Sequence, residues 1–335
     1  MSTTVADRVT VAGWVGSTNL GDELLFRLLR GLLADRGVAV GTPSVDPAGT
    51  AALHDVESFG HFGPSAMRRS LVASDAFVFG PGGLLQDETG IWNLPYHLRR
   101  LGPVRRVGIP WAGIGLGADG LSTDRGRSRV RRALVGHTAI AVRDEPSADA
   151  LRALGVDRVV RAADLAFLAE PPTVSQDGVL GVCLRASQSG RLRPGALDAG
   201  RTWPNERAAA LAAALDKTCQ ATGLTTRFVA LDAPVDGVVG TLARVDVVAT
   251  MRYHGAVLAA LGGAAVVALP HSPKLRSLAT DLGPGATVHD GEADGLAAAV
   301  SGVLAHRSHL ADAVDRLRTL AGRNVEVLDG LLETA

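Results

Sequence analysis

The chain of 335 residues carries 34 basic and 34 acidic side chains, and its formal net charge of zero provides no global field for binding nucleic acid or an anionic membrane. Its first residues lack the basic and apolar regions of a signal peptide, no apolar run approaches the roughly 18 residues of a spanning helix, and two cysteines are too few for a disulfide framework. These features predict a cytoplasmic protein with no stable membrane insertion, long enough for two domains of roughly 150 residues each.

Apolar runs bounded by glycine, aspartate and proline alternate with segments of helical spacing, a pattern typical of parallel strands joined by crossover helices. In the first half, the runs predict strands over residues 9–15, 75–79, 107–114 and 138–142, with a helix over 22–36. Each strand runs into a small or polar residue, and open parallel sheets place their ligands at these carboxyl ends. The loops after the strands are therefore the candidate functional segments.

The proline-containing segment 170–178 is the expected linker between an amino-terminal domain, 1–172, and a carboxyl-terminal domain, 173–335. The second half repeats the alternation, with strands predicted over 179–184, 226–231, 245–250 and 264–269 and helices over 206–222, from 254, from 273 and from 296. The sequence therefore predicts an α/β fold of two Rossmann-like domains whose mostly parallel sheets face a central cleft.

Residues 13–23, G-W-V-G-S-T-N-L-G-D-E, join the first strand to the first helix. The glycines permit tight turning and close ligand approach, and the helix start supplies unpaired N–H groups. The segment matches neither the dinucleotide fingerprint nor the phosphate loop. Because Asp22 and Glu23 also stabilise a helix start through its dipole, a ligand site and an ordinary capped helix both remain open.

A second glycine loop, residues 80–87, follows the next buried strand and reads G-P-G-G-L-L-Q-D. The N–H groups of Gly82 and Gly83 are candidates to face a ligand, and the side chains of Gln86 and Asp87 are candidates to hydrogen-bond a sugar. Taken alone, a simple strand-to-helix turn explains this loop better.

A third cluster, M-R-Y-H-G at 251–255, begins a helix directly after an apolar strand. Arg252 and His254 at a helix start form a natural anion site with a proton donor attached, and Lys274 follows the next strand. The alternative is a solvated arginine and a capping histidine. No G-x-S-x-G elbow, cysteine–histidine pair or zinc-type histidine spacing occurs, so we expect no metal and no cofactor.

The motifs form an ordered set: residues 13–23, residues 80–87, the glycines of 113–117, V-R-D at 142–144 with Ser147, D-L-A-F at 164–167, R-Y-H at 252–254, and Lys274. In this order and spacing, residues 9–285 resemble the polysaccharide pyruvyl transferase family, whose members fold like two-domain nucleotide-sugar glycosyltransferases of the GT-B class. The resemblance implies a role in cell-surface polysaccharide biosynthesis, with phosphoenolpyruvate as the donor.

By motif position, the resemblance implies that Arg143, Arg252, His254 and Lys274 form the donor site, and within it His254 is the candidate general acid. The pyruvyl group would be transferred to two hydroxyls of a sugar, forming a ketal and releasing phosphate. The amino-terminal domain would bind the acceptor, and three kinds of acceptor remain open: a lipid-linked sugar, a nucleotide-linked sugar or a small secondary metabolite. The expected acceptor-binding residues are Asn19, Asp22, Glu23, Gly82, Gly83, Gln86 and Asp87, and Asp22 is a second catalytic candidate.

Four departures from the family pattern concern Pro81 in the second loop, Tyr253 between Arg252 and His254, Leu116 after Gly115, and the short connection before Asp246. They leave the donor motif intact and affect the identity of the acceptor. The alternatives are a nucleotide-sugar-dependent glycosyltransferase of the same architecture and a non-catalytic sugar-binding relative, because the fold alone does not decide between these functions.

Overall fold

The computed structural model describes residues 6–17, 19–88, 90, 92–135, 139–172, 175, 177–184, 205–231, 235–269, 273–290 and 295–335. Contacts between residues divide the chain into two compact units: unit 1 consists of Met1–Ala169 with Leu317–Ala335, and unit 2 consists of Glu170–Arg316. The tail from 317 thus groups with unit 1 by its contacts, whereas the sequence analysis assigned it to the second domain. The expected domain boundary at 172 and the cleft stay predictions.

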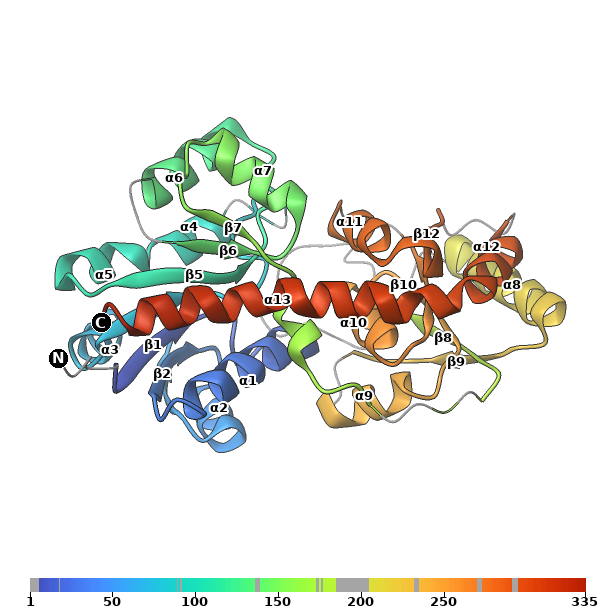
Figure 1. Ribbon diagram of the computed structural model, residues 1–335, viewed down its shortest axis with the longest axis horizontal. Helices are drawn as coiled ribbons and strands as arrows, with labels where there is room; N and C mark the ends of the chain where they lie inside the picture. The colour runs from blue at the N-terminus through green and yellow to red at the C-terminus, as the bar shows by residue number, and fades with distance from the viewer. Residues whose placement is uncertain are drawn as a thin grey trace. The chain divides into compact units, whose positions relative to one another are not determined.

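Unit 1 contains one parallel sheet of seven strands in the order β3-β2-β1-β4-β5-β6-β7, with helices on both sides (Figure 1). The strands are β1 (Arg8–Ala12), β2 (Ala39–Ser44), β3 (Glu57–Gly60), β4 (Ala76–Phe79), β5 (Trp111–Leu116), β6 (Ile140–Val142) and β7 (Val159–Arg161). The helices are α1 (Leu20–Ala34), α2 (Pro47–His54), α3 (Pro64–Val72), α4 (Asn93–Leu98), α5 (Leu101–Val107), α6 (Asp124–Leu134), α7 (Glu145–Ala153) and the short 3-10 helix η1 (Leu165–Leu168).

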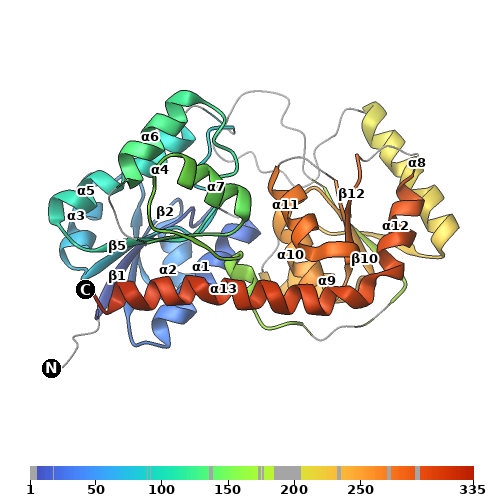
Figure 2. The same cartoon turned by 45° about the horizontal axis from the view of Figure 1, so that its top comes forward.

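Unit 2 contains a second parallel sheet, in the order β12-β11-β10-β8-β9, which is also flanked by helices (Figure 2). Its strands are β8 (Val179–Cys183), β9 (Thr225–Phe228), β10 (Val247–Thr250), β11 (Ala265–Ala268) and β12 (Ala286–Val288). Its helices are α8 (Asn205–Thr222), α9 (Val235–Leu242), α10 (Tyr253–Leu261), α11 (Pro273–Leu282) and α12 (Leu296–Ala305), with 3-10 turns η2 (Gly283–Gly285) and η3 (Arg307–His309). The last helix, α13 (Leu310–Leu332), contributes residues to both units.

The central strands β1, β4 and β10 lie where apolar runs predicted them, because a parallel strand covered on both faces is apolar along its length. The run 107–114 is divided differently: α5 ends at Val107, Gly108 adopts a φ of 83°, and β5 begins at Trp111. The sequence analysis missed β2, β3, β7 and β12. Strand β2 contains a glycine and a proline, which are turn residues by local rules, and the other three are short edge strands.

Among the described residues, none of the helices is both long and apolar enough to cross a bilayer.

Asn324 ties the carboxyl-terminal half of α13 to the sheet of unit 1. Its side chain is fully buried, with Oδ1 accepting from the N–H of Gly115 at 2.9 Å. Its Nδ2 donates to the carbonyl of Ala163 at 2.9 Å and to that of Ala321 at 3.0 Å. Because a buried amide without partners is costly, these bonds specify where the tail docks.

We expect Asn324→Leu to destabilise the protein by on the order of 3 kcal/mol, because each buried polar group left unsatisfied costs about 1–3 kcal/mol. Urea unfolding measures this as a lower midpoint at an unchanged slope. The exposed residue Glu326 on the same helix provides the control, and Glu326→Gln should stay within about 0.5 kcal/mol of wild type. An unchanged midpoint for Asn324→Leu would show that the tail docks without this side chain.

Candidate functional site

The loop after β1 leads into α1, and Asn19 caps that helix. The Oδ1 atom of Asn19 accepts from the N–H of Gly21 at 3.3 Å, and its Nδ2 donates to Oδ2 of Asp22 at 2.6 Å. Asp22 is thereby held in the first turn of α1, where the helix dipole favours a carboxylate. The sequence-predicted pair Asn19 and Asp22 is therefore in direct contact.

Glu23 is buried and holds the conformation of the same loop. Its Oε1 accepts from the N–H groups of Gly16 at 2.7 Å and Ser17 at 3.2 Å. Its Oε2 lies 3.0 Å from Nε2 of His54, the last residue of α2. Because both carboxylate oxygens are engaged within unit 1, the contacts of Glu23 are those of a positioning residue for the loop.

The loop after β4 runs beside the end of β5. The N–H of Gly82 donates to the carbonyl of Gly115 at 3.1 Å, and the N–H of Gly117 donates to the carbonyl of Gly82 at 3.0 Å. Gly82 has a φ of 117°, which side chains disfavour, and a Cβ there would lie 3.2 Å from Oδ1 of Asp22. The two glycine-containing loops of the sequence analysis therefore meet at Asp22 and Gly82.

Arg143 follows β6 and is only 4% exposed. Its Nη2 lies 3.0 Å from Oδ1 of Asp119, and its Nε lies 3.4 Å from Oδ2 of Asp144. A Cβ added to Gly117 would lie 2.6 Å from Nη2 of Arg143, and one added to Gly83 would lie 3.7 Å from it. Because two buried carboxylates share this guanidinium, Arg143 brings little uncompensated charge to an anionic ligand.

Asp119 was missed by the sequence analysis. Its position could have indicated it, because Asp119 follows Gly117 by two residues, just after a buried strand. The structure places it in contact with Arg143. Its side chain is 8% exposed, so the ion pair is largely shielded from water.

Asp87 connects the second glycine loop to the start of α6. Its carboxylate accepts from the N–H and hydroxyl of Ser122, at 2.8 and 2.7 Å, and from the N–H and hydroxyl of Thr123. Partial burial raises the pKa of Asp87, but these hydrogen bonds outweigh it and lower the pKa below its ordinary value. The backbone carbonyl of Gln86 accepts from Nδ2 of Asn93 at 3.3 Å, so this end of the loop is anchored twice.

Trp14, in the first loop, belongs to an aromatic cluster that the sequence analysis did not identify. Its ring centroid lies 5.7 Å from that of Tyr96 and 5.8 Å from that of His61. Arg100 stacks 4.7 Å from the Tyr96 centroid and donates to the carbonyl of Gly13 at 3.0 Å. Burial, Arg100 and then Arg99 lower the pKa of His61 to about 4, so this imidazole is neutral at pH 7.

In unit 2, the third cluster of the sequence analysis begins at the end of β10. Arg252 caps α10, its N–H donates to Oγ1 of Thr250 at 2.9 Å, and that hydroxyl donates to the Arg252 carbonyl at 3.0 Å. A Cβ on Gly255 would lie 2.9 Å from Oγ1 of Thr250 and 3.3 Å from Cβ of Cys183. The first turn of α10 therefore packs tightly on the carboxyl ends of β10 and β8.

Tyr253 lies between the other two members of this cluster. The ammonium of Lys274 is 5.9 Å from the centroid of the Tyr253 ring, and the His254 ring meets the same ring edge to face at 5.2 Å and 87°. Tyr253 itself is 6% exposed. The structure thus brings His254 and Lys274 together around Tyr253, a residue that the sequence analysis treated only as a departure from the family pattern.

Cys183 is fully buried beside this cluster. Burial raises the pKa of its thiol to about 12, against the opposing effects of the Thr250 hydrogen bond and the Arg252 charge. A thiol with this pKa is a poor nucleophile. In the part of the chain that is described, no three histidine, cysteine or acidic side chains are grouped as metal ligands.

A chain of two α/β units, each built on a parallel sheet, has the architecture of the GT-B class. Solved GT-B structures share this fold. UGT89C1 of Arabidopsis thaliana, solved with quercetin, aligns over 97% of this chain and 99% of its own, with a TM-score of 0.61 and 13% identity. UGT2 of Phytolacca americana, solved with UDP-2fluoro-glucose and pterostilbene, aligns over 98% and 99%, with a TM-score of 0.58 and 13% identity. CalG4, the calicheamicin glycosyltransferase, aligns over 97% and 98%, with a TM-score of 0.55 and 15% identity. Such low identities define the fold alone.

The sequence matches the polysaccharide pyruvyl transferase family over residues 19–273, which is most of the chain. The protein therefore belongs to this family, as the ordered motifs indicated. Membership makes it a transferase of the pyruvyl-transferring class with a sugar acceptor. No curated protein matches the sequence significantly.

We expect Asp87→Asn to lower stability at neutral pH by on the order of 1 kcal/mol, since water screens this half-exposed group. The folded pKa lies below the ordinary value of 3.8, so the carboxylate stabilises the fold above that pH and loses its effect as pH falls through the folded pKa. Thermal unfolding across acidic and neutral pH should show the two proteins converging in acid. The exposed neighbour Glu88 provides the control, because Glu88→Gln should leave stability nearly unchanged. Equal stability of Asp87→Asn and wild type at neutral pH would contradict the anchoring role of Asp87.

Proposed function

We propose that this protein transfers the pyruvyl group of phosphoenolpyruvate onto two hydroxyls of a sugar, forming a ketal and releasing phosphate. One observation carries the proposal beyond family membership. At the carboxyl edge of the unit 2 sheet, His254 and Lys274 contact Tyr253, and Arg252 caps the same helix. This edge is where parallel sheets bind ligands, and the cluster combines two cations with one proton-transferring group.

The donor carries a phosphate and a carboxylate close together, so several local cations must hold it. Arg252 suits a forked contact with an oxyanion, and Lys274 provides a compact point charge. The first N–H groups of α10 add a third source of positive potential, because helix starts favour anions. Arg143 is the weakest member of the expected donor set, since Asp119 and Asp144 already compensate its charge.

The reaction begins when His254 protonates the methylene carbon of the donor, which turns the adjacent carbon into a cation-like centre. A sugar hydroxyl attacks that centre and loses its proton as the carbon–oxygen bond forms. The bond from the same carbon to the phosphate oxygen then breaks, phosphate leaves, and a second hydroxyl closes the ketal with loss of its proton. Arg252 and Lys274 stabilise the carboxylate and the leaving phosphate throughout.

On the acceptor side, Asp22 is the proposed group that orients or deprotonates the sugar hydroxyl. Asn19 holds this carboxylate at 2.6 Å, and Gly82 comes close to it, since a Cβ there would lie 3.2 Å from Oδ1 of Asp22. Gly83 and Gln86 remain proposed acceptor contacts from the second loop. Glu23 and Asp87 are proposed to act through loop geometry, because hydrogen bonds within unit 1 engage their carboxylates.

Phosphate release with phosphoenolpyruvate, measured in the presence of lipid-linked, nucleotide-linked and free sugars, tests the proposal. Hydrolysis or transfer from nucleotide sugars, measured in parallel, tests the glycosyltransferase alternative. Phosphoenolpyruvate at about a hundred times its dissociation constant should also add roughly 2.7 kcal/mol of stability. Turnover of nucleotide sugars, with neither a thermal shift nor phosphate release from phosphoenolpyruvate, would reject the proposed donor.

Arg252→Ala and Lys274→Ala should each reduce turnover with phosphoenolpyruvate by on the order of 10²- to 10³-fold, the usual cost of losing one preorganised charge-stabilising donor. Steady-state kinetics at limiting and saturating donor measures the loss, and the thermal midpoint checks folding. Arg276→Ala is the matched control, because this exposed arginine lies on the same helix as Lys274. Normal kinetics in either test variant removes that residue from the donor site.

His254→Gln separates proton transfer from binding, because glutamine keeps a hydrogen-bonding side chain but cannot act as the acid. General acid catalysis contributes about 10²- to 10⁴-fold, so turnover should fall by that order while phosphoenolpyruvate still raises the thermal midpoint. If binding and turnover fall equally, His254 is a ligand-binding residue, and Asp22 becomes the next candidate for the acid.

A further inference from the structure

Arginine is concentrated in one stretch of unit 1. Residues 99–132 contain nine arginines and two aspartates, a formal charge of +7 in a chain whose total is zero. Arg100 of this stretch is buried, and most of the other arginines lie on α5 and α6, where they form a locally basic surface. Local positive potential of this kind attracts anions whatever the net charge of the protein.

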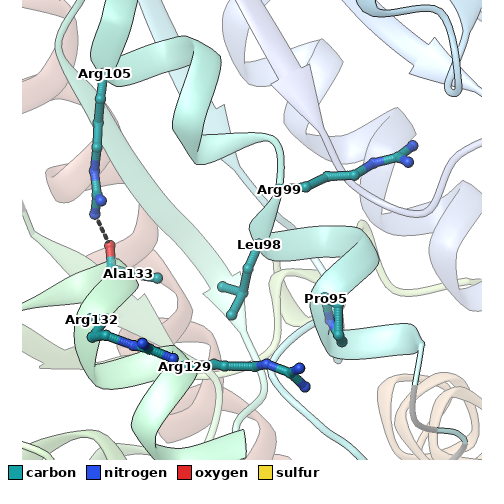
Figure 3. Close-up of a pocket in the computed structure, with 7 residues that line it drawn as sticks. All are labelled: Pro95, Leu98, Arg99, Arg105, Arg129, Arg132 and Ala133. Atoms are coloured by element: carbon teal, nitrogen blue, oxygen red, sulfur yellow. Dashed lines mark hydrogen bonds between the residues drawn. The ribbon is translucent and has the colours of Figure 1, made fainter.

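A shallow cavity of about 290 Å³, largely open to solvent, lies on this surface between α4, α5 and α6. It is lined by Arg99, Arg105, Arg129 and Arg132, around the apolar side chains of Leu98 and Ala133. No carboxylate lines it (Figure 3). Throughout the described part of the chain, no acidic side chain forms an ion pair with any of these four arginines.

Two of the four arginines are held in place by bonds to the protein. Arg105 donates from Nη2 to the carbonyl of Ala133 (Figure 3). Arg99 donates to the carbonyl of His61 at 2.9 Å and stacks 4.6 Å from the Tyr96 ring, so its head points away from the other three. The cavity is therefore left with the guanidinium groups of Arg105, Arg129 and Arg132, of which the first is already fixed.

The spacing of arginines on α6 lowers the stability of the helix when no anion is bound, because like charges lie next to one another. Arg125, Arg129 and Arg132 are separated by four and three residues, so they lie on one face, where like charges repel. The nearby Arg127 is different, because it pairs with Asp124 at 2.7 Å. An anion placed between Arg129 and Arg132 would relieve the repulsion.

We propose that the α4–α5–α6 pocket binds a phosphoryl group, such as the diphosphate of a nucleotide or of a lipid headgroup. Guanidinium groups match phosphate oxygens through forked hydrogen bonds, and three of them around one cavity favour a multiply charged phosphate over a carboxylate. The pocket is formed within unit 1, by residues other than Arg252 and Lys274 of unit 2. The inference therefore does not rest on the proposed pyruvyl transfer.

Calorimetric titration of the full chain with inorganic pyrophosphate tests the pocket. The double substitution Arg129→Gln with Arg132→Gln should weaken binding at least about tenfold, the effect of losing one charged hydrogen bond. Arg68→Gln with Arg69→Gln removes the same charge from exposed positions on α3 and should leave affinity within about twofold. Arg252→Gln should retain binding as well, and thermal midpoints without ligand establish that each variant is folded.

Two further arms identify the source of the phosphate. Uridine diphosphate competing with pyrophosphate supports a soluble nucleotide, and sedimentation with phosphatidic acid but not phosphatidylcholine vesicles supports a lipid headgroup, provided that only the pocket variant loses the effect. If both double variants lost pyrophosphate affinity equally, binding would depend on overall charge and not on the pocket, and the proposal would be overturned. The proposal would also be overturned if wild type showed no saturable pyrophosphate binding, or if only Arg252→Gln lost that binding.

Discussion

Every strand pair in both sheets is parallel, and the other features of the molecule depend on this constraint. A parallel pair requires a crossover segment, so helices cover the sheet faces and the central strands must be apolar. All carboxyl ends then emerge at one edge of each sheet. The Asp22 and Arg143 loops of unit 1 meet at one such edge, and Arg252, His254 and Lys274 gather at the other.

Charge in this neutral protein is organised locally and in three different ways. Arg143 is buried with Asp119 and Asp144, an arrangement that joins the ends of β5 and β6. In unit 2, the cations of the proposed donor site stand at a helix start beside an aromatic ring, where anions are favoured. On α6, Arg125, Arg129 and Arg132 lie on one face, where their like charges repel.

Several residues with the chemistry of ligands are instead anchors for the loops that carry the site. Glu23 holds the N–H groups of the first loop and contacts His54, and Asp87 fastens the second loop to the start of α6. Asn324 holds the tail against the end of β5. A glycine-containing loop is free to adopt many conformations, and these buried or multiply bonded groups select one of them.

Local pattern in the sequence determined the α/β class, the buried strands β1, β4 and β10, and the helix start at Arg252, because a buried parallel strand and a helix cap both leave a signature within a few residues. The short or proline-containing strands β2, β3 and β7 have no such signature, since neighbouring strands rather than their own residues stabilise them. Tertiary structure alone decided that Glu23 contacts His54, that Asp87 contacts Ser122, and that the tail packs against unit 1. These contacts join residues that are 31, 35 and more than 160 positions apart, and a local pattern carries no information about such distances.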